Sequence, residues 1–146
     1  MLLSIDPLLT PDLLYVLRAM GHGDELALVD ANFPATSVAG DNPLIRLDGV
    51  DTARAATAIL SVLPLDDFVD QPVRRMQVMG APDQVLDVHD DMQKAVNAAA
   101  GRDWPMGSIE RFEFYEVAKA AFAVVATGEQ RGYGCFMIKK GVIFPE

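Results

Sequence analysis

The feature of this sequence that most constrains its fold is a short apolar run, Leu26 to Val29, that ends in a carboxylate, Asp30. A run of this length with no polar alternation is typical of a strand buried on both faces of a sheet. Such a strand requires helices on either side of the sheet. The sequence therefore favours an α/β fold, with Asp30 at the carboxyl end of the strand.

Signals for helices and strands alternate along the rest of the chain. Thr10, Pro11 and Asp12 predict a helix start, because a hydroxyl caps free amides, proline suits the first helical position and an acid complements the helix dipole. Gly21 predicts the end of that helix. Further patterns predict strands over 44–47, 73–79, 109–112, 121–126 and 135–139, helices over 51–63, 82–100 and 113–120, and a loop over 34–43. We expect one domain over residues 1–146, with three layers and a mainly parallel sheet covered by helices.

Composition and charge exclude several classes of protein. The formal net charge of −9 at pH 7 disfavours binding to nucleic acid, which requires a basic face. Cys135 is the only cysteine, so no intrachain disulfide can form, and the first residues do not resemble a signal peptide. No apolar run approaches the roughly 20 residues of a membrane-spanning helix. We therefore expect a cytoplasmic protein without a nucleic acid or membrane partner.

The two histidines differ in their surroundings. His22 lies between Gly21 and Gly23, in a backbone that can bring its imidazole close to a ligand, although an exposed loop histidine fits the same residues. His89 lies among acids of a predicted helix, and we expect a surface residue without a role. Asp30 is the strongest acidic candidate, because a half-buried carboxylate needs a partner. No strong metal motif is present.

Arg111 and Tyr133 are further candidates for a binding site. In an open parallel sheet, ligands bind beyond the carboxyl ends of the strands, which favours the loops after Asp30 and Met79 and those around Arg111 and Tyr133. The guanidinium of Arg111 can hold hydroxyl or carboxylate oxygens, or form an ion pair with a neighbouring glutamate, Glu110 or Glu113. Tyr133 can cover a sugar ring or pack at an edge.

Five segments together carry a resemblance to a known family. They are Met-Gly-His-Gly-Asp-Glu at 20–25, Asp-Ala-Asn-Phe-Pro-Ala at 30–35, Glu-Arg-Phe-Glu-Phe-Tyr-Glu at 110–116, Ala-Val-Val-Ala-Thr-Gly-Glu at 123–129 and Tyr-Gly-Cys-Phe-Met-Ile-Lys-Lys-Gly-Val at 133–142. In this order, the segments resemble the L-fucose mutarotase branch of the RbsD/FucU family, which also contains D-ribose pyranase. The Phe-Pro step and the Arg-Phe-x-Phe-Tyr-Glu run favour the fucose branch.

The resemblance implies a fold, a site and a reaction. By resemblance, His22 is the catalytic acid/base, while substrate-binding residues line the sugar site: Asp30, Arg111, Tyr133, Gly134 and Cys135. Asp30 is expected to orient His22 or a sugar hydroxyl. The substrate is a free monosaccharide, L-fucose or a similar sugar, and no metal or organic cofactor is implied. Members of the family resemble ring-shaped homo-oligomers, often decamers, with sites at subunit interfaces.

Two departures from the family pattern leave alternatives open. Cys135 stands where the family has an asparagine, and Asn32 stands where a histidine is common. The first departure replaces a side-chain amide by a weak thiol donor. The alternatives to anomer exchange are pyranose to furanose interconversion of D-ribose, a sugar-binding accessory of transport without turnover, and a purely structural oligomer.

Overall fold

The predicted alternation of helices and strands is confirmed in a computed structural model that describes residues 1–146. The chain forms five helices and six strands: α1 (Pro11–Ala19), β1 (Glu25–Val29), α2 (Ala35–Ala39), β2 (Leu44–Leu47), α3 (Thr52–Leu60), β3 (Val73–Met76), α4 (Asp87–Ala100), β4 (Gly107–Ile109), α5 (Arg111–Lys119), β5 (Ala123–Thr127) and β6 (Phe136–Lys139). No helix combines the length and the apolar character needed to cross a membrane.

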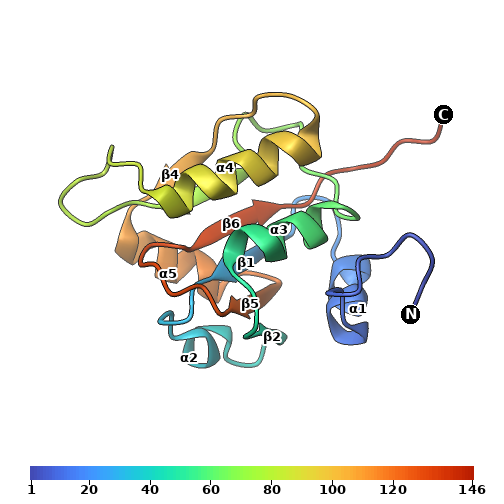
Figure 1. The fold of residues 1–146 in the computed structure, drawn as a ribbon, viewed down its shortest axis with the longest axis horizontal. Coiled ribbons are helices and arrows are strands. Elements are labelled where there is room, and N and C mark those ends of the chain that lie inside the picture. The colour runs from blue at the N-terminus through green and yellow to red at the C-terminus, as the bar shows by residue number, and fades with distance from the viewer.

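The strands form one mixed sheet in the order β2-β5-β1-β6-β3-β4. The pairs β2·β5, β5·β1 and β3·β4 are parallel, whereas β6 runs antiparallel to both of its neighbours. The sheet is therefore mainly parallel, as predicted, with one reversed strand near its centre (Figure 1). Because β6 is reversed, its amino end lies at the same edge of the sheet as the carboxyl ends of β1 and β3.

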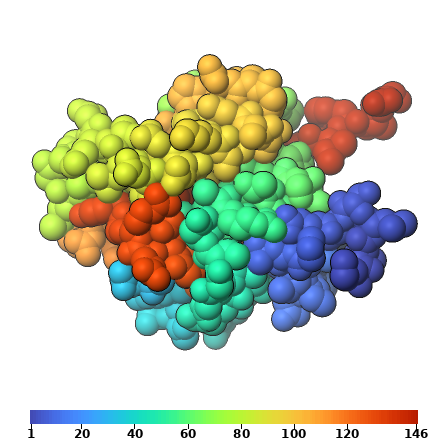
Figure 2. Space-filling model, viewed as in Figure 1, coloured from blue at the N-terminus to red at the C-terminus, as the bar shows by residue number.

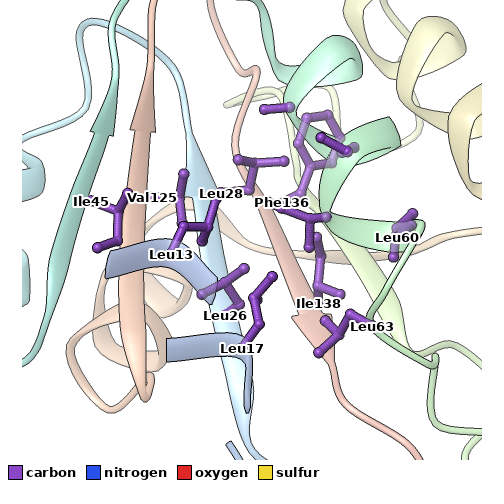
Figure 3. Close-up of a cluster of buried hydrophobic side chains, with 14 of the residues drawn as sticks. Leu13, Leu17, Leu26, Leu28, Ile45, Leu60, Leu63, Val125, Phe136 and Ile138 are labelled. Carbon is purple, nitrogen blue, oxygen red and sulfur yellow. The ribbon is translucent and has the colours of Figure 1, made fainter. Parts of the chain in front are cut away.

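The two faces of the sheet carry separate apolar clusters, which gives the three predicted layers. On one face, Leu26 and Leu28 of β1 and Phe136 of β6 pack against α1, α3 and α4 (Figure 3). On the other face, Ala27 and Val29 pack against α2 and α5. Residues 26–29 are fully buried, so the apolar run is the covered strand that the sequence indicates.

Caps fix the starts of three helices. Thr10 Oγ1 accepts from the Leu13 N–H at 3.2 Å, and Asp51 Oδ1 accepts from the Arg54 N–H at 2.8 Å, as the sequence indicates. Glu110 Oε2 accepts from the N–H of residue 113 at 3.0 Å and begins α5. The strand predicted over 109–112 was therefore wrong after Ile109, because Glu110 caps a helix that begins at Arg111, two residues before the predicted start.

Further boundaries differ from the prediction. The strand predicted over 73–79 ends at Met76, because a turn follows in which the Ala81 N–H donates to Val78 O at 3.0 Å. The helix predicted over 82–100 begins only at Asp87, because the turn before it is closed by the Leu86 N–H, which donates to His89 Nδ1. The segment predicted as a loop over 34–43 contains the short helix α2. Gly21 follows α1 without a left-handed backbone conformation, which Gly23 adopts instead, at φ 84°.

Candidate functional site

A cavity of about 230 Å³ opens at the edge of the sheet where β1 and β3 end and β6 begins. Its lining comes from the loop after β1, the end of β3, helix α5 and the loop before β6: Asp30, Asn32, Phe33, Met76, Arg111, Tyr115, Gly132, Tyr133 and Cys135. Four of the six predicted site residues thus line one cavity. A fifth, Gly134, lies between two lining residues but does not itself line the cavity. The sixth, His22, lies elsewhere.

Asp30 joins the two loops that frame this cavity. Its carboxylate is buried, and Oδ1 accepts from the backbone N–H groups of Asn32 and Phe33, both at 3.0 Å. Oδ2 accepts from the Gly134 N–H at 3.2 Å and from Cys135 Sγ at 3.4 Å. Asp30 therefore holds the cavity in shape, and within one chain it does not contact His22.

The Cys135 thiol is a protonated donor in this structure. Burial, together with the charge of the Asp30 carboxylate, raises the pKa of Cys135 well above its ordinary value. A thiol held in this state is a poor nucleophile, because only the thiolate is reactive. Cys135 therefore contributes packing and a weak S–H donor to the cavity wall.

Arg111 lies in the first turn of α5 and extends over the cavity. It forms no ion pair with Glu110 or Glu113. Its guanidinium instead contacts Met79 Sδ at 3.6 Å and lies 5.6 Å from the centre of the Phe112 ring. Because no carboxylate occupies its donors, Arg111 is free to bind oxygen atoms of a ligand.

Aromatic side chains form the apolar part of the cavity. The rings of Phe33 and Tyr115 stack with centroids 5.1 Å apart. Tyr133 has an uncommon positive φ of 61°, and its hydroxyl accepts from the Met79 N–H at 3.3 Å. Sequence reasoning singled out Tyr133 but missed the other two rings, which belong to the Phe-Pro and Phe-Tyr-Glu elements. Ring faces beside polar donors suit a sugar, which has both C–H and hydroxyl surfaces.

His22 lies at the opposite edge of the sheet from the cavity. It precedes β1, whereas Asp30 follows β1, and a strand of this length spans roughly 16 Å. The His22 side chain is 46% exposed. One copy of the chain therefore does not bring His22 and the cavity together.

Asp66, which sequence reasoning missed, is the partner of His22. Asp66 Oδ1 lies 3.1 Å from His22 Nε2 and also accepts from the Phe68 N–H at 3.1 Å. Burial raises the pKa of Asp66, but the hydrogen bonds from Phe68 and His22 outweigh it, so that the net pKa lies below its usual value. Asp66 is therefore ionised near neutral pH and accepts a hydrogen bond from the Nε2–H group, which leaves Nδ1 of His22 available to a ligand.

Backbone hydrogen bonds hold the loop that carries His22. The Gly23 N–H donates to Lys140 O at 2.8 Å, and the Lys140 N–H donates to Asp24 O at 2.9 Å. The Asp24 carboxylate accepts from the Gly21 N–H at 2.7 Å, so the Asp24 side chain holds the turn that carries His22. These contacts fix the position of the imidazole relative to the sheet.

A network of charged side chains supports the loop between β5 and β6. Glu129 is buried and accepts from Thr52 Oγ1 at 3.2 Å and from Arg131 Nη2 at 2.9 Å. Arg131 also pairs with Asp91 of α4 at 2.7 Å. The loop lies at the surface between α3 and α4 (Figure 2). The network ties the loop that carries Tyr133 to both helices.

Acid is expected to weaken the fold through Glu129. Burial raises its pKa, but the hydrogen bonds and charge of Arg131 outweigh that effect and lower it below the ordinary 4.5. The unfolded chain therefore binds the proton first, so the free energy of unfolding falls as the pH drops below 4.5. Urea unfolding at several pH values checks this. Glu129→Gln should flatten the pH dependence, and an equally steep dependence in that variant would contradict the assignment.

Comparisons with known proteins agree with this architecture. The model of the RbsD / FucU transport protein family matches residues 3–143. The fucose mutarotase of Danio rerio is 48% identical over 150 residues, which cover 98% of this chain and 95% of that protein. FucU from Bifidobacterium longum has a TM-score of 0.91 at 38% identity, covering 97% of this chain and 99% of that one.

A solved structure with a bound sugar is also similar. The fucose mutarotase from Streptococcus pneumoniae, in complex with L-fucose, has a TM-score of 0.88 and is 37% identical, covering 98% of this chain and 100% of that one. The family match spans nearly the whole chain, and the fold matches structures of that family. The chain therefore belongs to the RbsD/FucU family.

Proposed function

We propose that this protein is a mutarotase that interconverts the α and β anomers of L-fucose or a closely related free sugar. The observation that carries this proposal is the cavity in which Arg111 and the Tyr133 loop face stacked aromatic rings. Its volume of about 230 Å³ is smaller than typical sites for drug-sized ligands, which suits one monosaccharide. The fucose mutarotases among the relatives support the same sugar.

Mutarotation needs two proton transfers and no redox step. A proton leaves the anomeric hydroxyl and another reaches the ring oxygen, after which the open aldehyde rotates and closes on its other face. A histidine suits this task because it gives and accepts protons near neutral pH. In the proposed mechanism, His22 protonated on both ring nitrogens donates its Nδ1 proton to the ring oxygen while the anomeric proton passes to water. Ring closure reverses both transfers, and Arg111 holds sugar hydroxyls throughout.

The site requires two copies of the chain, because His22 and the cavity lie at opposite edges of one sheet. We therefore place His22 of one subunit against the cavity of its neighbour in a homo-oligomer. Exposed apolar side chains lie beside both parts of the proposed site. Phe68 is 64% exposed and lies beside His22. Met79 is 58% exposed, Phe112 is 64% exposed, and both lie beside Arg111. Exposed apolar groups at both edges are typical of surfaces that become buried on association. A cytoplasmic location, expected from the sequence, is part of the same proposal.

Replacing Asp66 is expected to lower turnover more than sugar affinity. Asp66→Ala leaves the His22 imidazole without the acceptor that selects its tautomer, so kcat should fall about 10- to 100-fold while KM changes little. The adjacent Asp67 is exposed and makes no hydrogen bond, so Asp67→Ala is the matched control. Steady-state anomer exchange rates check this. Equal kcat values for the two variants would refute a role for Asp66 in catalysis.

NMR saturation transfer between the α and β anomeric protons tests the proposed function. Native protein should accelerate exchange of L-fucose, and D-ribose is measured in parallel. Acceleration on D-ribose alone would instead support pyranose to furanose interconversion. Binding of either sugar without acceleration would support a binding accessory, and the absence of binding would support a structural oligomer.

A further inference from the structure

We propose that His89 is a positioning residue of the sugar site, which fixes the peptide between Tyr133 and Gly134 from the interior of the protein. His89 was expected at the surface, and the structure corrects this expectation, because His89 is only 1% exposed. The inference rests on the proposed function in one respect: the loop that His89 holds lines the proposed sugar cavity.

One peptide unit is held at both of its polar ends. His89 Nε2 lies 3.0 Å from the carbonyl oxygen of Tyr133, and the N–H of the same peptide, that of Gly134, donates to Asp30 Oδ2 at 3.2 Å. These two partners come from α4 and from the end of β1. Together they set the rotation of the peptide plane, and with it the backbone that carries the Tyr133 side chain.

Tyr133 needs such restraint because of its backbone conformation. A positive φ of 61° is uncommon for a residue with a bulky side chain, and such conformations persist only where surrounding contacts determine them. The third restraint is the tyrosine hydroxyl, which accepts from the Met79 N–H at 3.3 Å. Loss of the His89 contact removes the only hydrogen bond to the Tyr133 carbonyl.

The hydrogen bonds of His89 identify its tautomer. Nδ1 accepts from the Leu86 N–H at 3.0 Å, so the ring proton is on Nε2, which donates to Tyr133 O. Only the neutral imidazole makes both bonds. Burial lowers the pKa of His89, and the charge of Arg75 lowers it further. The hydrogen bond to the Tyr133 carbonyl and the charge of Asp90 raise this pKa but do not outweigh burial, so the net pKa of His89 lies below its ordinary value. The neutral form that holds the peptide therefore dominates near neutral pH.

Two substitutions of His89 separate the hydrogen bond from the space that the ring fills. His89→Leu fills the interior but donates nothing, whereas the side-chain amide of His89→Gln reaches as far as Nε2 and can donate to Tyr133 O. Because the peptide shapes a binding surface, KM for L-fucose should rise roughly tenfold in His89→Leu with kcat changed less than about threefold, and His89→Gln should recover most of the native KM.

Val96→Ala is the matched control. Val96 is also buried in α4, but its side chain forms no hydrogen bond to the loop that carries Tyr133. It should lower Tm without changing KM. A raised KM in His89→Leu that His89→Gln restores supports the inference. Equal KM values in native protein, His89→Leu and His89→Gln would overturn it.

A second readout does not depend on turnover. The amide resonance of Gly134 should move in His89→Leu and return toward its native position in His89→Gln, because the Tyr133–Gly134 peptide changes orientation only in the first. If native protein does not act on L-fucose, the proposed function fails, and this resonance still decides the inference: an unmoved Gly134 resonance in His89→Leu would contradict it.

Discussion

His22→Ala is expected to lower kcat/KM for L-fucose anomer exchange by roughly 10²- to 10⁴-fold, the usual contribution of a positioned acid/base group. Sugar binding should persist, because the cavity lies at the other edge of the sheet and keeps all of its lining residues. Tm should change little, since the His22 side chain is 46% exposed and the backbone of its loop is held by Lys140.

Saturation transfer gives the exchange rate of this variant, and a thermal melt provides the control for folding. An unchanged rate in folded His22→Ala would remove His22 from the mechanism. A loss of both rate and sugar binding would instead mean that His22 contributes to affinity, in disagreement with a role limited to proton transfer.

Gly128→Ala is expected to have the largest effect on stability. Gly128 follows β5, and a methyl group on its Cα would overlap the backbone carbonyl of Asp48, which follows the paired strand β2. The neighbouring atoms are backbone and cannot turn away. We expect the free energy of unfolding to fall by about 3 kcal/mol, which corresponds to a fall in Tm of about 6–12 °C for a domain of this size.

Gly49→Ala is the matched control for this prediction. Gly49 belongs to the same turn after β2, has no positive φ, and would place a methyl group in open space. Its Tm should stay within about 2 °C of the native value. Similar Tm values for the two variants would show that the contact between residue 128 and the Asp48 carbonyl does not determine which residues position 128 can accept.

The parts of the site that follow directly from strand ends were predictable. Asp30 ends an apolar run, and an apolar run of that kind is a buried strand, so its carboxylate lies at the ligand-binding edge. The same reasoning implies the separation of His22 from the cavity, because His22 precedes the strand that Asp30 follows. The resemblance grouped the two residues in one site, and the strand between them separates them within one chain, which is why the proposed site includes a second subunit.

Other features depend on contacts that no local pattern reveals. Asp66 lies in a segment without regular structure, which is brought to His22 by the pairing of Leu65 with Lys140. His89 was misread because acids surround it in sequence, although helical spacing places it with Val88, Met92 and Val96 on the buried face of α4. Arg111 was placed in a strand because the cap provided by Glu110 was not recognised.

Coexpression of His22→Ala with Arg111→Ala tests whether one subunit completes the site of another. Each variant alone should be inactive, because one lacks the acid/base and the other lacks the sugar-binding guanidinium. In mixed oligomers, about one site in four should combine an intact His22 with an intact cavity, so roughly a quarter of native activity should return. Coexpression of His22→Ala with the double variant His22→Ala/Arg111→Ala, which supplies no His22, should stay inactive. Activity of the first mixture that remains at the level of the control would contradict a site shared between subunits.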